Sequence, residues 1–368
     1  MNIKVGGYKG KYRIVSLAFC EDVRDDLMND GLDTVYISEN SIVLSPDNIV
    51  LSDDKDMIDK FQSANNYDVY ELLEDGRLIG YYDDSSIDNY FFVTAKCNSN
   101  CIMCPSPEAS RRIGENANID NLIELAKHIP ADTPHLTITG GEPFMAGKEI
   151  FRFIQFLKDK FECTEFLFLT NGRIFAVDAF VQELRKTIPI DSILAIPLHG
   201  SRPNIHDQIT QTKGSFIQTI TGIKKLLGLG IRIELRVVVN KLNANDIENI
   251  AKLIVNEMSE IAYVSIIAME MTGSAYINRD KVWITYSEVA NKIEKGILVL
   301  IESGIDVKLY NFPLCTVKKK FWTLCEKSIS PNKVRYSEKC NICTIKKACG
   351  GIFAGTILME KEELKPIL

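Results

Sequence analysis

The residues best suited to chemistry are three cysteines, Cys97, Cys101 and Cys104, which directly follow the apolar run 90–94. The run is typical of a short buried strand, so the cysteines fall on the loop at its carboxyl end. Three thiolates can hold three irons of a cubane, whereas a cluster ligated entirely by protein normally uses four cysteines. The trio therefore predicts a [4Fe-4S] cluster with one iron open to a small chelating molecule. Inert buried thiols are the alternative, and zinc is disfavoured because no histidine lies nearby.

A second group of cysteines lies near the carboxyl end of the chain. Cys340, Cys343 and Cys349 have C-x2-C-x5-C spacing, and Cys315 precedes them. Four thiolates can ligate every iron of a second cubane, but they also suit tetrahedral zinc. We interpret Cys325 as a spare thiol that could compete with Cys315.

Composition excludes several classes of protein. The net charge is −6, and no basic run is longer than 318–320, so nucleic-acid binding has no electrostatic footprint. No apolar run approaches the ~18 residues that span a bilayer, and the start does not resemble a signal peptide. We therefore expect a cytoplasmic protein without membrane contact. Ten cysteines in such a chain favour metal binding over disulfides, and we expect Cys20 and Cys163 to be buried thiols.

Hydrophobic patterns divide the chain into three parts. Residues 1–88 contain short β-rich runs, with Asp75-Gly76 as a hairpin signal, and predict a separate module. Residues 89–285 repeat strand then helix six times, which predicts a parallel α/β sheet, open or curled into a partial (βα)6 barrel. Residues 286–368 contain a helix, a strand and the second cysteine group. The predicted strands of the middle part are 91–94, 135–139, 165–169, 192–198, 231–239 and 262–268.

Several polar residues follow these strands, where the functional loops of a parallel sheet lie. Gly140 and Gly141 would let backbone approach a ligand, and Glu142 would present a carboxylate suited to an ammonium group. Thr170 and Asn171 form the next turn. A charged residue within a strand needs a partner, so Arg236 either pairs with an acid such as Glu234 or reaches a cofactor carboxylate. Met269 suits an adenine face or core filling equally.

The three-cysteine motif and the sequence Gly140-Gly141-Glu142-Pro143 together resemble the radical S-adenosylmethionine (radical SAM) superfamily. The resemblance implies that the open iron binds S-adenosylmethionine, that Glu142 holds its amino group, and that Thr170 and Asn171 lie beside it. Members usually have an aromatic residue at the position of Met103 and a ribose-binding serine at that of Pro197. His199 or Ser201 would take over the latter role. A proton shuttle is the second reading of His206-Asp207, after a local helix-entry contact.

The carboxyl-terminal cysteines resemble the auxiliary-cluster extension (twitch or SPASM type) of radical SAM peptide maturases, which favours a second [4Fe-4S] cluster over zinc. Further stretches resemble the HxsC-type maturases of His-Xaa-Ser systems, among them 73–78, 89–94, 310–315 and 349–353. Residues 331–333 depart from that pattern. The resemblance implies a precursor peptide, a second radical SAM maturase and an external electron donor as partners. The alternatives are an enzyme acting on a small metabolite and a catalytically silent partner subunit. The sequence identifies no catalytic side chain.

Overall fold

The structure is a computed structural model that describes residues 2–360 and 363–368. The predicted β-rich amino-terminal module is confirmed as a seven-stranded mixed sheet with its own apolar core. Two short helices, α1 (Glu21–Asn29) and α2 (Lys55–Asp59), accompany this sheet. In spatial order, its strands are β1 (Asn2–Lys4), β7 (Arg77–Tyr82), β6 (Val69–Leu72), β2 (Arg13–Ala18), β3 (Thr34–Ile37), β4 (Ile42–Ser45) and β5 (Ile49–Ser52).

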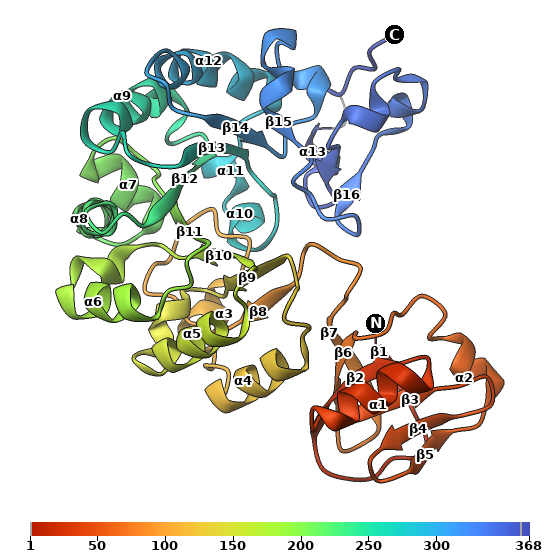
Figure 1. Ribbon diagram of the computed structural model, residues 1–368. Coiled ribbons are helices and arrows are strands. Elements are labelled where there is room, and N and C mark those ends of the chain that lie inside the picture. Colours follow the sequence, from red (N-terminus) through yellow and green to blue (C-terminus); the bar gives the residue numbers. More distant parts are fainter. Residues whose placement is uncertain (1, 361–362) are drawn as a thin grey trace.

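The second sheet contains eight strands, and each pairs in parallel with its neighbour in the sequence. Figure 1 shows the strands following one another in an arc, with helices on its outer side. The strands are β8 (Tyr90–Phe92), β9 (His135–Thr139), β10 (Glu165–Leu169), β11 (Ser192–Pro197), β12 (Arg232–Val239), β13 (Tyr263–Ala268), β14 (Val307–Tyr310) and β15 (Cys325–Glu326). The parallel α/β prediction is therefore confirmed.

The helices that connect these strands have apolar faces packed on one face of the sheet. On β12, for example, Ile233, Leu235 and Val237 join the core under the helices, whereas Glu234 and Arg236 occupy the alternate positions. The outer helices are α4 (Ile119–His128), α5 (Glu149–Lys160), α6 (Asp178–Thr187), α7 (Pro203–Thr210), α8 (Ser215–Leu227), α9 (Ile247–Glu257) and α12 (Tyr286–Glu302). None of the helices in the described ranges is long and apolar enough to cross a membrane.

The six predicted strands are present as β8–β13, and β14 and β15 extend the same sheet. Helix α12 acts as a further crossover: Thr285 and Glu288 form a capping box at its start, and the helix packs against α9. Gly296 allows this close packing, since a Cβ there would lie 2.8 Å from Ile247. The sheet consequently continues beyond residue 285. The pattern of a long helix followed by a strand was visible in the sequence, but its membership of the sheet depends on pairing between β13 and β14.

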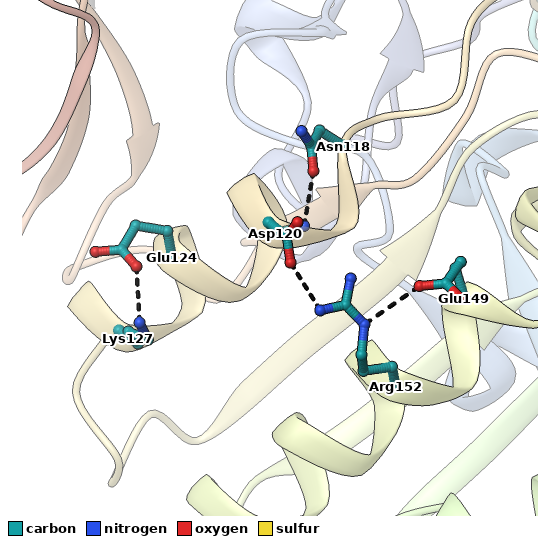
Figure 2. Close-up of polar contacts among 6 residues, drawn as sticks. All are labelled: Asn118, Asp120, Glu124, Lys127, Glu149 and Arg152. Atoms are coloured by element: carbon teal, nitrogen blue, oxygen red, sulfur yellow. Dashed lines mark hydrogen bonds and ion pairs between the residues drawn. The ribbon is translucent and has the colours of Figure 1, made fainter.

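The polar contacts between α4 and α5 lie on the outer surface (Figure 2). Asn118 caps α4 by accepting a 2.8 Å hydrogen bond from the backbone N–H of Asp120. The Asp120 carboxylate binds Arg152 of α5 at 2.7 Å, and Glu149 binds the same guanidinium at 3.2 Å. Exposed pairs of this kind contribute about 0–1 kcal/mol each. The buried apolar faces therefore do more to hold the two helices on the sheet.

The amino-terminal module packs against the end of α4 and the loop that leads into β9. Ser16 of β2 and His128 lie 2.8 Å apart (Oγ to Nδ1), and Tyr82 and Thr133 lie 2.9 Å apart (Oη to Oγ1). Burial lowers the pKa of His128 to about 4, so this contact is between neutral groups. These contacts lie at the amino edge of the parallel sheet, opposite the edge where the cysteine loop begins.

The remaining described elements are short and lie mainly around the cysteine-rich regions. The expectation that Cys20 and Cys163 are buried was wrong: both are exposed, one just before α1 and the other in the turn between α5 and β10. Short apolar neighbours in sequence misled the prediction, because each thiol sits where an element starts or ends. The short elements are α3 (Glu108–Ile113), α10 (Gly273–Ile277), α11 (Arg279–Val282), β16 (Val334–Arg335), β17 (Ile352–Phe353) and α13 (Ile357–Glu360).

Candidate active site and second cysteine centre

The first three cysteines lie on a loop that leaves the carboxyl end of β8, as predicted. Cys97, Cys101 and Cys104 are all partly buried. The loop is fastened to the end of α7 by backbone hydrogen bonds from Asn100 N–H to the Thr210 carbonyl (3.0 Å) and from Ile102 N–H to that of Ile209 (2.9 Å). The sheet and α7 therefore fix the position of the thiols.

A second segment, 272–278, which contains α10, packs against the carboxyl-terminal half of the cysteine loop. Ser274 N–H donates to the Cys104 carbonyl at 3.0 Å, and the Asn278 amide donates to that of Ile102 at 3.1 Å. Gly273 is required at this point because its φ is +54° and a Cβ would lie 2.1 Å from the Pro105 carbonyl oxygen. Both sides of the cysteine loop are thus held by other parts of the sheet's carboxyl edge.

Glu142 is buried beside the cysteine loop and has three hydrogen-bond donors. Its Oε1 accepts from Thr170 Oγ1 (2.8 Å) and Phe144 N–H (3.2 Å), and its Oε2 accepts from Asn171 N–H (2.6 Å). Burial raises the pKa of this carboxyl group to about 7, against the opposing effect of these bonds. One lone pair of Oε2 remains available for a ligand donor. The structure therefore brings Glu142, Thr170 and Asn171 together, as their place after neighbouring strands suggested.

Gly140 and Gly141 pack against the segment that enters the cysteine loop. A Cβ on Gly140 would lie 2.4 Å from the Thr94 carbonyl oxygen, and one on Gly141 would lie 2.4 Å from that of Lys96. Gly141 N–H also donates to the Thr94 carbonyl at 2.7 Å. The glycines make room for the backbone of residues 94–96 of the same chain. Their smallness places Glu142 close to the cysteines.

Arg173 is a functional candidate that the sequence interpretation missed. Its Nη1 donates to the Asn98 carbonyl and to Ser99 Oγ (2.9 Å), and its Nε donates to Gln218 at 2.8 Å. Asn171 reinforces the contact through a 2.6 Å bond to the Asn98 side chain. The available signal was a cation directly after the Asn171-Gly172 turn, at the edge where the cysteines were expected.

The buried cysteine thiols need a positive charge nearby before they can ionise. Burial raises the pKa of Cys97, and it raises that of Cys101 to about 12. Metal ions supply such compensation, because binding replaces the thiol protons. The donor set of three thiols in a loop that no histidine enters fits an iron–sulfur cluster.

His199 and Ser201 occupy different environments. His199 is 2% exposed, and its Nδ1 has no hydrogen-bond partner. Burial lowers its pKa to about 3, so the ring is neutral. Ser201, by contrast, donates from both Oγ (2.8 Å) and N–H (2.7 Å) to Asp246. Of the two, only His199 retains an unused polar atom, which favours it as a ligand contact.

The His206-Asp207 pair supports local structure. Asp207 accepts hydrogen bonds from Gly214 N–H (2.6 Å), Ser215 Oγ (2.8 Å) and Phe216 N–H (2.8 Å) at the start of α8. His206 Nδ1 accepts from the backbone N–H of His199 at 3.2 Å. These bonds favour the helix-entry role over a proton shuttle.

Arg236 pairs with an acid and Met269 packs among apolar side chains, so each matches one of its two predicted roles. Arg236 Nε binds Glu234 at 2.9 Å, and Glu234 is fully buried with one carboxylate oxygen unpaired. Met269 packs in an apolar cluster with Met103 and Met271, which Cys101 also contacts. The ion pair predicted for Arg236 is therefore present. The methionines form an apolar surface next to the cysteine loop.

The second cysteine group lines one cavity. Cys315, Cys340, Cys343 and Cys349 all contribute to its wall. Cys349 Sγ accepts backbone hydrogen bonds from Leu314 and Gly351, each at 3.4 Å. Backbone donors of this kind stabilise sulfur that carries negative charge. The predicted set of four thiols is thus brought to one place.

The carboxyl-terminal tail covers this cavity, which the sequence did not reveal. Leu364, Lys365 and Pro366 line it, and Ile367 N–H donates to Cys343 Sγ at 3.4 Å. Thr344 fastens the tail through two hydrogen bonds to the Ile367 carbonyl, of 2.8 Å and 2.9 Å. No sequence motif marks these residues, because their role comes from backbone atoms.

Positive side chains also surround the cavity. Its lining includes Arg335, Lys346 and Lys365 and no carboxylate. Cys325 does not contribute; it starts β15 and contacts the Phe321 carbonyl at 3.7 Å. Among the described residues, no three His, Cys, Asp or Glu side chains gather closely enough to hold one metal ion. The cysteine assignments therefore rest on spacing, burial and the shared cavity.

Comparison with known proteins identifies the middle of the chain. A model of the radical SAM superfamily matches residues 91–254. These residues are similar to the radical SAM domain of that superfamily. Such a domain implies a [4Fe-4S] cluster and S-adenosylmethionine, as predicted. The matched region begins within β8 and ends within α9, so it contains the cysteine loop, Glu142 and Asn171.

Similar proteins cover only part of this chain. A GTP 3′,8-cyclase of Petrotoga mobilis is 26% identical over 200 residues, which is 50% of this chain and 58% of that protein. The subtilosin biosynthesis protein AlbA of Bacillus subtilis is 30% identical over 166 residues, or 44% of this chain and 35% of AlbA. This chain therefore spans little more than half of the first relative and about a third of AlbA.

Among solved structures, SuiB of Streptococcus suis has a TM-score of 0.51 at 13% identity and covers 69% of this chain and 55% of SuiB. This likeness supports the shared fold of a parallel sheet with additional regions at each end of the chain.

Proposed function

We propose that this protein is a radical SAM enzyme that oxidatively modifies a ribosomally made peptide, of the His-Xaa-Ser type, together with a second maturase. The observation that carries the proposal is that the three-cysteine loop and Glu142 meet at one edge of a parallel sheet that leads directly into a four-cysteine cavity. The name of AlbA, a bacteriocin biosynthesis protein, supports a peptide substrate. The HxsC-like stretches support the His-Xaa-Ser type.

The residues of the first site would bind the cluster and its ligand. Cys97, Cys101 and Cys104 would hold the irons, and the free lone pair of Glu142 would accept the ammonium group of S-adenosylmethionine. The chemistry supplied by a bound cluster would be one-electron reduction of S-adenosylmethionine, which generates a 5′-deoxyadenosyl radical. Met103 and Met269 shield that region from water with an apolar surface. His199 offers a neutral nitrogen to the ribose, and the guanidinium of Arg236 remains a candidate for the carboxylate.

The second site would hold an auxiliary [4Fe-4S] cluster. Its four thiols, its backbone donors to sulfur and its three cations suit an anionic group with no open iron. A fully ligated cluster would have no open iron for substrate and would supply an electron acceptor. Loss of one hydrogen atom, one proton and one electron from the peptide would give a net loss of two hydrogens. Zinc in this cavity would remove that oxidative route.

The amino-terminal module receives no substrate role in this proposal. A β-rich module can accept an extended peptide by added strand pairing. Its contacts with the core lie at the amino edge of the parallel sheet, however, whereas Glu142 and the cysteines lie at the carboxyl edge. Added strand pairing at the module would not by itself bring a peptide to the first site.

A small-metabolite enzyme is the second candidate, favoured by the GTP 3′,8-cyclase relatives. Co-expression with a His-Xaa-Ser precursor peptide and the partner maturase distinguishes the two. Mass spectrometry should show peptide lacking two hydrogens, and Cys97→Ala/Cys101→Ala/Cys104→Ala should abolish the change. Unmodified peptide, with S-adenosylmethionine still cleaved by the enzyme, would favour the small-metabolite reading.

A further inference from the structure

Arg111 is a buried arginine that grips the cysteine loop on both sides of the three thiols. It belongs to α3 and is 4% exposed. Its Nη2 donates to the Asn100 side chain at 2.7 Å, and its Nη1 donates to the Ser106 carbonyl. Its own carbonyl accepts from Cys97 N–H at 3.1 Å. The residue thus contacts the loop at Cys97, between Cys97 and Cys101, and after Cys104.

The charge of Arg111 has no counterion in the described parts of the chain. Its side-chain partners are an amide oxygen, a backbone carbonyl and the hydroxyl of Ser274 (3.2 Å), all neutral, and its Nε is buried without any partner. The adjacent Arg112, in contrast, is exposed and pairs with Glu108 at 2.5 Å. A buried charge that nothing compensates is expensive. Something anionic is therefore expected beside Arg111.

The cysteine loop that Arg111 binds can supply this negative charge. The Arg111 carbonyl accepts a hydrogen bond from Cys97 N–H, and the guanidinium binds Asn100, the residue before Cys101. A four-iron core with three cysteine thiolates is a net anion, and one-electron reduction makes it more negative. A fixed cation beside it stabilises the reduced state more than the oxidised one.

We propose that Arg111 is the counterion of the three-cysteine cluster and raises the reduction potential of that cluster. The inference rests on the proposed cluster but not on the proposed peptide substrate. Arg111 is a positioning and charge-compensating residue, since its guanidinium acts on the thiolates and the loop. If Arg111 only held the loop in place, its hydrogen bonds would be needed but its charge would not.

Three variants separate charge from shape. Arg111→Gln keeps hydrogen-bonding capacity and loses the charge, Arg111→Lys keeps the charge and loses the guanidinium fork, and Arg112→Gln is the matched control on the same helix. Each full-length protein is reconstituted anaerobically, its iron is counted, and the fraction of reduced cluster is followed by electron paramagnetic resonance during a redox titration. The signal that responds to S-adenosylmethionine reports the first cluster.

At a fixed potential, the ratio of reduced to oxidised cluster should fall about tenfold in Arg111→Gln, equivalent to about 59 mV. It should change less than threefold in Arg111→Lys and not at all in Arg112→Gln. Thermal unfolding gives a second readout: Arg111→Gln should lower the Tm of the iron-loaded protein more than that of the iron-free protein.

If the reduction potential is unchanged in fully iron-loaded Arg111→Gln, the proposal is wrong, and Arg111 only holds the loop in place. If Arg111→Gln fails to load iron, Arg111→Lys decides, because the proposal requires it to load and a clamp requires it to fail. Wild-type protein that binds no iron at the first site would instead refute the proposed cluster, which is a separate outcome.

Discussion

The two cysteine centres are held by different kinds of structure. The first lies on one loop between β8 and α3, and the parallel sheet, α7 and two arginines fix its position. The second is assembled from segments between Pro313 and Pro366 that contain two-residue strands, 3₁₀ turns and one short α-helix. The position of the first centre is therefore fixed by the parallel sheet and the elements packed against it. We expect the order of the second to depend more on its ligand, because its strands and helical turns are only two to six residues long.

The cations at the two centres differ in how deeply they are buried. Arg111 is buried and has no counterion among the residues that the structure describes. At the second centre, Arg335, Lys346 and Lys365 line the wall, and Arg335 and Lys365 are exposed. A buried charge acts strongly at short range, while exposed charges are screened by water and salt. The first centre is accordingly suited to a fixed reduction potential, and the second to general attraction of an anionic group.

The largest effect should follow from removing the first ligand set. Cys97→Ala/Cys101→Ala/Cys104→Ala should lose all production of 5′-deoxyadenosine and about half of the bound iron, since the second centre keeps its own thiols. Cys163→Ala is the matched control because that thiol is exposed and distant in the fold. Continued 5′-deoxyadenosine production by the triple variant would contradict the site.

Removing the second ligand set should test the dependence of the extension on its ligand. Cys343→Ala/Cys349→Ala should lower the iron content from close to eight atoms to about four. It should also make residues after 313 sensitive to protease while the parallel sheet stays folded. Metal analysis of the wild type that gave four irons and one zinc would replace the auxiliary cluster with a structural zinc site.

A smaller effect is expected at Glu142. Glu142→Gln loses a charge-assisted hydrogen bond worth roughly 1.5–3 kcal/mol, so S-adenosylmethionine should bind about ten- to a hundredfold more weakly. Glutamine also offers one acceptor oxygen where Glu142 uses two, so iron content and circular dichroism must be unchanged for a valid comparison. Glu149→Gln, on the surface, should bind normally. Normal affinity in Glu142→Gln would move the cofactor away from this carboxylate.

The pH dependence of binding should be the mildest effect. Burial raises the pKa of Glu142 to about 7, and only its ionised form attracts an ammonium group. Affinity for S-adenosylmethionine should therefore rise as the pH increases through about 7, by up to about tenfold per pH unit below that value. Calorimetric titration across this range checks the direction. Glu142→Gln should lose the dependence, and a flat profile in the wild type would show that the carboxylate is ionised throughout.

Local sequence patterns were sufficient for the first centre. The apolar run before Cys97 and the run before Gly140 are strands whose carboxyl ends must share an edge in a parallel sheet, so Glu142 and the thiols had to be neighbours. The predicted bounds of β9 and β10 agree with the structure for the same reason: their periodicity is local.

Tertiary structure decided the features that depend on long-range approach. Nothing near Arg111 in sequence indicates that Ser274 and Asn100 would enclose its charge. Likewise, β14 became part of the sheet through pairing with β13, and the tail residues 364–366 became a wall of the second cavity. Sequence reports side-chain type and local periodicity, but burial of a charge and closure of a cavity depend on which distant segments pack together.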